Sequence, residues 1–412
     1  MIAFHYPPYH GGSGIHRTLK FSRYLLDHQW QPIILSADPK AYPEIDTAQL
    51  LHIPASVRVK RAFALDAARH LSIRGSYSKW TALPDRWASW LLGAVPAGLR
   101  LVRQYRPDAI WSTYPIATAH LIGLTLQRLT GLPWIADFRD SMTEEAYPGD
   151  PMTRQVFRWI ERRTVKHCRR AVFTTPGTAE MYARRYPLVP RSRWSIIANG
   201  YDEEDFVEVE QLMRETPSRN HRALLVHSGV LYPSERDPSI FFAALADLRR
   251  EGKISPANLH IVLRGSGSEE FYRQQLRQHA IEDIVSLEKS ISHHSALEEM
   301  LRADGLLLFQ AANCNHQIPA KIYEYLRARR PIFAMTDPEG DTARLLKSVG
   351  VETIAALDRK DCIAEGLLNF LTRIHEGHAT SPADHEILRH SRKFRSQELA
   401  ALLESMGLDL RN

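Results

Sequence analysis

The apolar residues of this chain form short runs typical of buried strands, separated by longer stretches with helical spacing. The spacing predicts a first helix over residues 15–28 and a helical tail over 385–406. Strands that alternate with helices predict parallel sheets covered by helices on both faces. The expected strands are residues 2–6, 32–36, 109–112, 133–137, 171–175, 195–198, 223–228, 260–263, 284–287, 305–309 and 331–335.

The length of 412 residues exceeds what one hydrophobic core normally supports. We therefore expect an α/β protein with two doubly wound, Rossmann-like domains. A turn at Asn199–Gly200, followed by an acidic and polar stretch, predicts a linker at residues 201–222. The first domain is then residues 1–200, the second 223–384, and a C-terminal helix occupies 385–412. In such domains ligands bind at the carboxyl ends of the strands, so we expect the domains to face each other across a cleft.

The composition is that of an ordinary globular protein, with 44% hydrophobic and 24% charged residues. No apolar run reaches the ~18 residues of a membrane span, and no signal peptide is recognised, so we expect a cytoplasmic protein. Three scattered cysteines show no metal spacing, and no metal site is predicted. The net charge of +6 favours an anionic partner, such as a nucleotide diphosphate, a lipid pyrophosphate or a membrane face, whereas no nucleic-acid-binding motif is present.

The segment from Gln317 to Leu326 is the most informative motif. Gln317, Ile318 and Pro319 lead into a helix on which Lys321 and Glu324 share one face. A cation, a carboxylate and free N–H groups at one helix start suit a ligand that carries hydroxyls and phosphates. An ordinary helix start with one surface ion pair is the alternative.

This segment resembles the donor-site motif of family-4-type retaining glycosyltransferases, of the kind that act in bacterial cell-surface polysaccharide synthesis. Glu324 matches the second of that family's two glutamates, which holds the ribose, while His316 occupies the position of the first. The resemblance implies the GT-B fold, with the C-terminal helix crossing back to the first domain. It implies a metal-independent hexosyltransferase that needs no cofactor beyond its donor, a nucleotide diphosphate sugar. The acceptor would be a hydroxyl of a glycan or of a lipid-linked sugar.

The same resemblance assigns further residues along the chain. The donor would be contacted by a glycine loop after the first strand. The reacting carbon would lie beside a group of residues at the end of the strand at 133–137. A cation six residues after Val230 would neutralise the leaving diphosphate, helped by Lys321, with Arg264 as a second candidate. Backbone near residue 291 would contact the nucleobase. The residues assigned in this way are Gly12, Ser13, Gly14, Asp137, Arg139, Asp140, Arg236, Arg264, Gly265, Ser266, Gly267 and Ile291.

Two other functions stay open at this stage. Because Val230 and His316 depart from the family pattern, the chain could be a catalytically degenerate partner subunit that only binds a nucleotide sugar. A nucleotide-sugar epimerase on the same fold is the other alternative.

An insert at residues 60–90 interleaves cations with aromatic residues. Such a pattern suits peripheral contact with the inner face of the cytoplasmic membrane. The helical spacing of Trp87, Trp90 and Leu91 favours instead a place in the core. The other residues concerned are Lys60, Arg61, Phe63, Arg69, Arg74, Tyr77, Lys79, Trp80 and Arg86.

Overall fold

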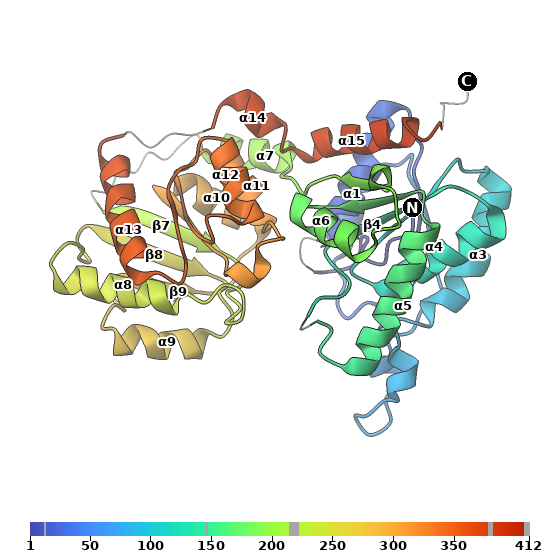
Figure 1. The fold of residues 1–412 in the computed structure, drawn as a ribbon, viewed down its shortest axis with the longest axis horizontal. Helices are drawn as coiled ribbons and strands as arrows, with labels where there is room; N and C mark the ends of the chain where they lie inside the picture. Colours follow the sequence, from blue (N-terminus) through green and yellow to red (C-terminus); the bar gives the residue numbers. More distant parts are fainter. Residues whose placement is uncertain (12–13, 146, 214–221, 378–381, 408–412) are drawn as a thin grey trace. The chain divides into compact units, whose positions relative to one another are not determined.

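The computed structural model describes residues 1–11, 14–145, 147–213, 222–377 and 382–407, and every structural statement below concerns these residues. The chain forms two compact units (Figure 1). The first comprises Met1–Asn199 together with Arg392–Asn412, and the second comprises Gly200–Ser391. Both are built from parallel strands and helices, so the prediction of two Rossmann-like domains is confirmed.

The strands of the first unit form one continuous parallel array. A two-stranded sheet, β1–β2, and a four-stranded sheet, β3–β4–β5–β6, are joined by Ile2, which bridges Leu35 of β1 and Ser112 of β3. The expected strand at residues 2–6 is therefore reduced to this short bridge. The strands are β1 (Ile33–Ala37), β2 (Arg58–Ala62), β3 (Ile110–Thr113), β4 (Trp134–Arg139), β5 (Arg170–Phe173) and β6 (Trp194–Ile196).

Helices pack on this array around a core that contains Trp90, Trp134 and Phe138. Close packing of α4 on β4 depends on Gly123, because a Cβ there would lie 2.7 Å from the Trp134 ring. The helices are α1 (Gly14–Tyr24), η1 (Leu25–His28), η2 (Pro39–Ala41), η3 (Thr47–His52), α2 (Ala67–His70), η4 (Lys79–Ala82), α3 (Trp90–Tyr105), α4 (Ala117–Thr130), α5 (Pro151–His167), α6 (Pro176–Arg185) and η5 (Arg191–Arg193).

The C-terminal helix returns to the first unit. Helix α15 (Arg392–Glu404) places Leu399 and Leu403 against Phe21 and Leu25, so apolar burial holds it in the first unit. The predicted return of the tail is confirmed, but it begins at Arg392 rather than at residue 385. The preceding helix, α14 (Asp384–Leu388), belongs to the second unit.

The second unit has the strand order β12–β11–β10–β7–β8–β9, all parallel. This is the Rossmann order, in which the chain direction across the sheet reverses between β7 and β10. The strands are β7 (Ala223–Ser228), β8 (Leu259–Arg264), β9 (Val285–Glu288), β10 (Gly305–Phe309), β11 (Ile332–Met335) and β12 (Ile354–Ala355). The helices not yet named are α7 (Glu203–Met213), α8 (Ser239–Arg250), α9 (Glu269–Gln278), α10 (His293–Arg302), η6 (Ala312–Cys314), α11 (Lys321–Ala328), α12 (Asp341–Ser348) and α13 (Lys360–His375).

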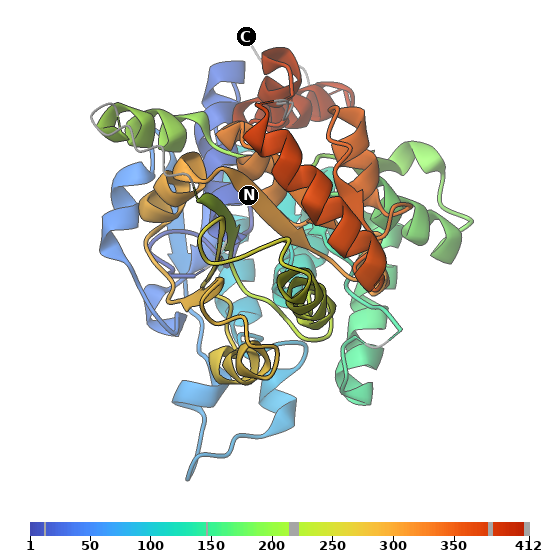
Figure 2. The same cartoon turned by 90° about the vertical axis from the view of Figure 1, so that its left-hand side faces the viewer.

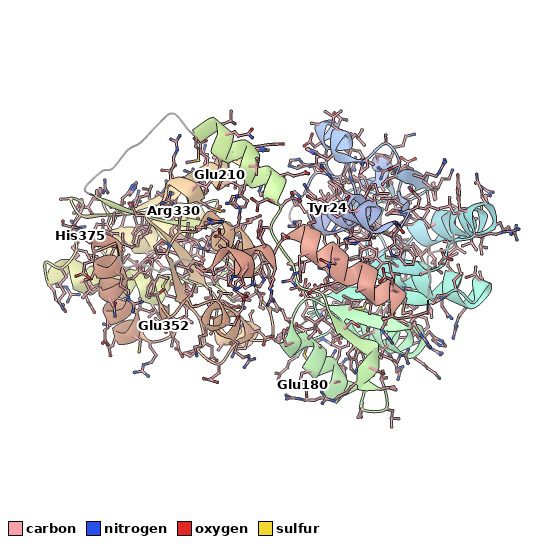
Figure 3. All side chains as sticks on the ribbon, turned by 90° about the horizontal axis from the view of Figure 1, so that it is seen from above. Tyr24, Glu180, Glu210, Arg330, Glu352 and His375 are labelled. Atoms are coloured by element: carbon pink, nitrogen blue, oxygen red, sulfur yellow. The ribbon has the colours of Figure 1, made fainter. Side chains whose placement is uncertain are left out.

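The predicted linker at 201–222 is corrected over its first half, which forms helix α7; residues 214–221 lie outside the described part. The acidic residues that suggested a linker are ion-pair partners. Glu203 and Glu210 both bind the buried guanidinium of Arg327 on α11, with closest contacts of 2.6 and 2.8 Å. Figure 3 labels Glu210 on α7 and Arg330 after α11. A buried arginine needs such partners, and this requirement fixes the helix on the second unit.

None of the helices in the described residues combines the length and apolar character needed to cross a bilayer.

Candidate functional residues in each of the two units

In the second unit, the predicted site residues gather at the point where the strand order reverses. Strand β7 ends at Ser228, and helix α11, which carries Lys321 and Glu324, follows β10. Tyr325 ties the two together, because its hydroxyl accepts a 3.0 Å hydrogen bond from the backbone N–H of Ser228. Doubly wound sheets bind their ligands at this position.

Lys321 is held by a histidine that the sequence analysis did not single out. The buried His227 lies at the end of β7, with Nδ1 2.8 Å from the carbonyl oxygen of Leu307 and Nε2 3.1 Å from Nζ of Lys321. Burial and the neighbouring Lys321 lower the pKa of His227 well below its usual value, so the ring is neutral. When Nδ1–H donates to Leu307, Nε2 accepts from the Lys321 ammonium; Nε2 also lies 3.1 Å from the carbonyl oxygen of Gly229. His227 is thus a positioning residue for the cation.

The positive charge of the Lys321 ammonium is poorly balanced by its surroundings. Burial, and then the positive charge of Arg236, lower its pKa to about 7, while Glu324 acts in the opposite direction. Arg236 makes a long hydrogen bond of 3.4 Å to the carbonyl of Val230 and lies 5.5 Å from the centre of the Tyr232 ring. Two neighbouring cations in a partly desolvated place favour an anionic ligand.

Gly229 makes room for this lysine. Its φ is +112°, and a Cβ there would stand 2.8 Å from Nζ of Lys321. Gly267 follows β8 with φ +63°, and a Cβ there would stand 3.3 Å from Cγ1 of Val230. The turns after β7 and β8 therefore lie side by side, and glycine is needed in both.

The loop before α11 is fixed from beneath by Gln310. The Nε2 group of Gln310 donates to the carbonyls of Cys314 and Gln317, each at 2.9 Å. His316, Gln317 and Ile318 are half-buried on this loop, and Pro319 is buried. The loop and Glu324, which is also half-buried, therefore belong to one rigid edge of the sheet.

Other predicted contacts of the second unit are less suited to a ligand. The guanidinium of Arg264 is paired with Glu299 at 2.6 and 3.1 Å, so its charge is already balanced and it is a poor second candidate for the diphosphate. The N–H of Gly265 donates to Glu288, and the side chain of Ser266 is fully buried. Ile291 is 40% exposed, as a base-contacting position would require.

In the first unit, Asp137 is a buried structural carboxylate. Arg17 of α1 grips it with two hydrogen bonds of 2.8 and 3.0 Å, and Thr113 donates a third at 2.9 Å. The same guanidinium donates to the carbonyls of Ile197 and Ala198 at 2.9 and 3.0 Å. The geometry thus assigns Asp137 to support, and only the neighbouring residues of the predicted group can reach a ligand.

Arg139 and Asp140 follow Asp137 at the carboxyl end of β4. Arg139 has a left-handed φ of 60°, and its buried Nε has no partner in the described residues. Its Nη1 would lie 3.4 Å from a Cβ on Gly14, which also adjoins His5. Burial and Arg139 lower the pKa of His5 to about 4, so this histidine is neutral. Asp140 is exposed, and Gly12 and Ser13 lie outside the described residues.

Comparison with known proteins finds a family match for the first unit. Residues 11–200 match the family described as glycosyl transferase 4-like domain. The matched residues make up nearly all of the first unit, and the match is consistent with a family-4-type glycosyltransferase. No curated protein matches the sequence.

Solved structures share the GT-B fold of this glycosyltransferase along nearly its whole length. Sucrose-phosphate synthase from Thermosynechococcus elongatus aligns with a TM-score of 0.66 at 14% identity, covering 98% of each chain. Anabaena Alr3699/HepE in complex with UDP-glucose aligns at 0.64 and 14% identity, covering 98% of this chain and 99% of that one. WaaG, a glycosyltransferase involved in lipopolysaccharide biosynthesis, aligns at 0.65 and 13% identity with the same coverage.

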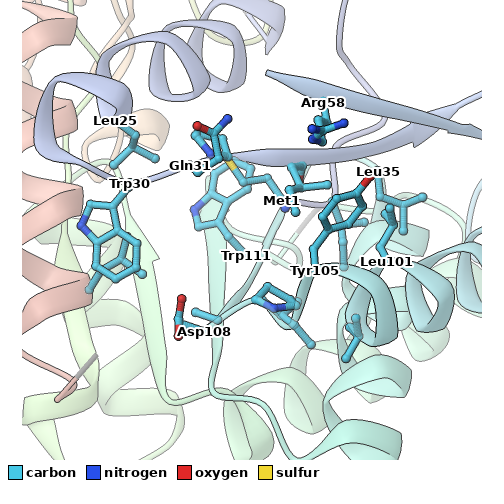
Figure 4. Close-up of a pocket in the computed structure, with 18 of the residues that line it drawn as sticks. Met1, Leu25, Trp30, Gln31, Leu35, Arg58, Leu101, Tyr105, Asp108 and Trp111 are labelled. Atoms are coloured by element: carbon cyan, nitrogen blue, oxygen red, sulfur yellow. Dashed lines mark hydrogen bonds between the residues drawn. The ribbon is translucent and has the colours of Figure 1, made fainter. Parts of the chain in front are cut away.

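The glycosyltransferase also has a cavity of about 520 Å³ in its first unit, shown in Figure 4. Its lining includes Met1, Trp30, Tyr105 and Trp111, and the neighbouring strands β1 and β3 begin there. The cavity therefore lies at the amino edge of the sheet, away from the residues discussed above. It is not part of the candidate active site.

Two histidines that could suggest a metal are used otherwise. His293 and His294 open α10, which Ser292 caps, and they face Asp205 and Glu208 of α7 at 3.4 and 2.9 Å. Among the described residues, no group of three or more His, Cys, Asp or Glu side chains is placed to hold a metal ion.

Three side chains that shape the site escaped the sequence analysis: His227, Arg17 and Glu299. Each acts on a predicted residue from far away in the chain, at separations of 94, 120 and 35 residues. No local pattern indicates such pairs. A buried position at a strand end was the available signal for His227.

We expect Asp137→Ala to lower the free energy of unfolding of the first unit, because the substitution leaves Arg17 buried without a counter-charge. The loss in unfolding free energy should be about 3–5 kcal/mol. Glu145→Ala, at an exposed carboxylate of the same unit, should change it by less than about 0.5 kcal/mol. Urea unfolding followed by tryptophan fluorescence measures both, and equal stability of the two variants would show that the Arg17–Asp137 pair does not support the fold.

Proposed function

We propose that this glycosyltransferase is a retaining, metal-independent hexosyltransferase. It moves a sugar from a nucleotide diphosphate sugar to a hydroxyl of a glycan or lipid-linked acceptor. The observation that carries the proposal is the half-buried Lys321 ammonium, which His227 holds at 3.1 Å and which lies beside Arg236, at the point where the strand order of the second unit reverses. A diphosphate would supply the negative charge that this pair of cations lacks.

The cations would act mainly on the leaving group. As the bond from the anomeric carbon to the diphosphate breaks, its electrons pass to the phosphate oxygen, and Lys321 and Arg236 stabilise the growing charge. Charge donors fixed in advance usually supply the largest part of such catalysis. The acceptor oxygen then bonds to the anomeric carbon on the face that the diphosphate leaves, and its proton passes to the departing phosphate. No protein nucleophile takes part.

The remaining residues would bind the donor. Glu324 offers carboxylate oxygens to the ribose hydroxyls, as the family resemblance implies. The rigid loop from His316 to Pro319 would contact the sugar. The comparison with Anabaena HepE, solved with UDP and UDP-glucose, supports a nucleotide sugar as the donor class.

The test begins with a panel of nucleotide sugars. A ligand present at about 100 times its Kd adds about 2.7 kcal/mol of stability, which thermal denaturation detects. The NMR signal of the product's anomeric proton then reports the stereochemistry. Retained configuration, with a rate unchanged by EDTA, is expected. Inverted product or loss of activity in EDTA would contradict the proposal, isomerised donor would indicate an epimerase, and binding without turnover a degenerate subunit.

Binding of a nucleoside diphosphate should weaken as the pH rises above 7. The pKa of Lys321 in the free protein is about 7, and a bound anion must raise it, so binding takes up a proton above that pH. The affinity should fall by up to about tenfold per pH unit. Calorimetry in buffers of different ionisation enthalpy measures the proton uptake. In Lys321→Arg, whose side chain stays charged, the uptake should vanish, and its persistence would assign it to another group.

Glu324→Ala should weaken donor binding at least about tenfold, since removing a partner of hydrogen-bonded hydroxyls costs about 1.5–3 kcal/mol when the partner is charged. Glu282→Ala, at an exposed glutamate of the same unit, is the matched control. Calorimetric titration with the best donor of the panel measures both. Unchanged affinity in Glu324→Ala would remove this residue from the donor site.

A further inference from the structure

Part of the insert at residues 60–90 forms a loop that projects from the first unit. In Figures 1 and 2 it extends beyond the helices as the lowest blue segment. The largest apolar side chains on it are exposed: Ile73 by 78% and Trp80 by 74%, with Leu71 and Tyr77 also exposed. Exposed apolar residues that gather in one protrusion indicate an interaction site, whereas isolated exposed apolar residues do not.

The loop is built to present these side chains. Ile73 and Ser76 exchange backbone hydrogen bonds of 2.8 and 3.1 Å across a tight turn. The turn requires left-handed backbone at Arg74 and Gly75, with φ of 53° and 80°. At its base, Arg86 binds the buried Asp66 through two hydrogen bonds of 2.6 and 2.9 Å. The tip is thus a defined structure on a fixed base.

The charge of the loop is of one sign. Residues 67–84 contain Arg69, Arg74 and Lys79 and no aspartate or glutamate. Arg69 donates a hydrogen bond to the backbone carbonyl of Tyr42, so part of its guanidinium is already bound within the protein. Lys79 has an 83% exposed side chain, and its nearest carboxylate is the partly exposed Asp150 at 3.9 Å, a weak surface contact. Arg74 and Lys79 can therefore meet an anionic partner.

The structure divides the aromatic residues of the insert into two groups. Trp90 is fully buried, and the Trp87 ring lies 4.6 Å from that of Phe4 while its Nε1 donates to the carbonyl of Ala41. Both belong to the core, as their helical spacing indicated. Arg86 is held by Asp66, so the surface available to a partner is confined to residues 71–80.

We propose that residues 71–80 dock this protein on an anionic lipid bilayer. Trp80 and Tyr77 sit at the level of the headgroups, as aromatic residues prefer, and Ile73 and Leu71 enter the boundary of the acyl chains. Arg74 and Lys79 meet the lipid phosphates. A bilayer fits better than a folded protein partner because the apolar tips and the cations share one small protrusion. The proposal goes beyond sugar transfer and does not depend on the donor site.

Sedimentation with vesicles tests the proposal on the full chain. Vesicles of phosphatidylcholine are compared with vesicles in which part of the lipid is phosphatidylglycerol. We expect binding to the anionic vesicles at low salt and much weaker binding in high salt or to phosphatidylcholine alone. Equal binding to both kinds of vesicle, or none to either, would overturn the proposal.

Two double variants separate the contributions of charge and apolar contact. Arg74→Gln with Lys79→Gln should weaken binding to anionic vesicles about 25-fold, because each cation near such a surface contributes about 1 kcal/mol and 1.4 kcal/mol is a factor of ten. Ile73→Ser with Trp80→Ser should weaken it at least as much. Wild-type binding by both would overturn the proposal.

Matched controls lie on the same unit, outside the loop. Arg103→Gln with Lys166→Gln removes two exposed cations, and Leu51→Ser with Leu188→Ser removes two exposed apolar side chains. These variants should bind anionic vesicles like the wild type; losses as large as in the loop variants would show that no specific loop contact exists. Affinity for a nucleoside diphosphate should be unchanged in all of them, which separates this test from that of the donor site.

Discussion

The carboxyl edge of the first sheet depends on one buried ion pair. Arg17 leaves α1, binds both oxygens of Asp137 at the end of β4, and satisfies two carbonyls after β6. One guanidinium thus joins three segments that the chain brings together only on folding. A buried pair is tolerated because almost every donor and acceptor has a partner, and it fixes the backbone on which Arg139 and Asp140 stand.

In the second unit, by contrast, a half-buried cation, Lys321, is left without a full counter-charge. His227 holds Nζ of Lys321 through a neutral ring nitrogen, which orients the ammonium without neutralising it. If a carboxylate stood in place of His227, it would neutralise the positive charge of Lys321 within the protein, as Glu299 neutralises that of Arg264. The difference between these two cations separates a group available to a ligand from one that serves the fold.

The sequence was sufficient for most of the strands and their order, because strand runs, glycine turns and the start of α11 are local patterns. It did not predict the short strands β2 and β12, and residues 2–6 form a bridge in place of the expected strand. It misassigned the acidic segment that became α7, since acidic composition does not reveal a distant Arg327. The sequence placed Asp137 in the site by strand register. Register indicates where a side chain lies, but not that Arg17 binds both of its carboxylate oxygens. The sequence also left open whether Trp87 and Trp90 contact a membrane or belong to the core. Their packing in the structure places both in the core, and burial depends on the whole fold.

The departure from the family pattern at Val230 has a geometric answer. The family resemblance implies a basic residue at this position, which Val230 does not provide, yet Lys321 extends to the same turn, where its Nζ adjoins Gly229, the neighbour of Val230. A Cβ at residue 229 would stand 2.8 Å from Nζ and would displace the end of this lysine, and the φ of +112° favours glycine there in any case. The positive charge next to Arg236 is thus supplied from α11 instead of from β7. Because the half-buried Lys321 has a pKa lowered to about 7, its charge responds to the anion that binds, a property that an exposed arginine at residue 230 would not share.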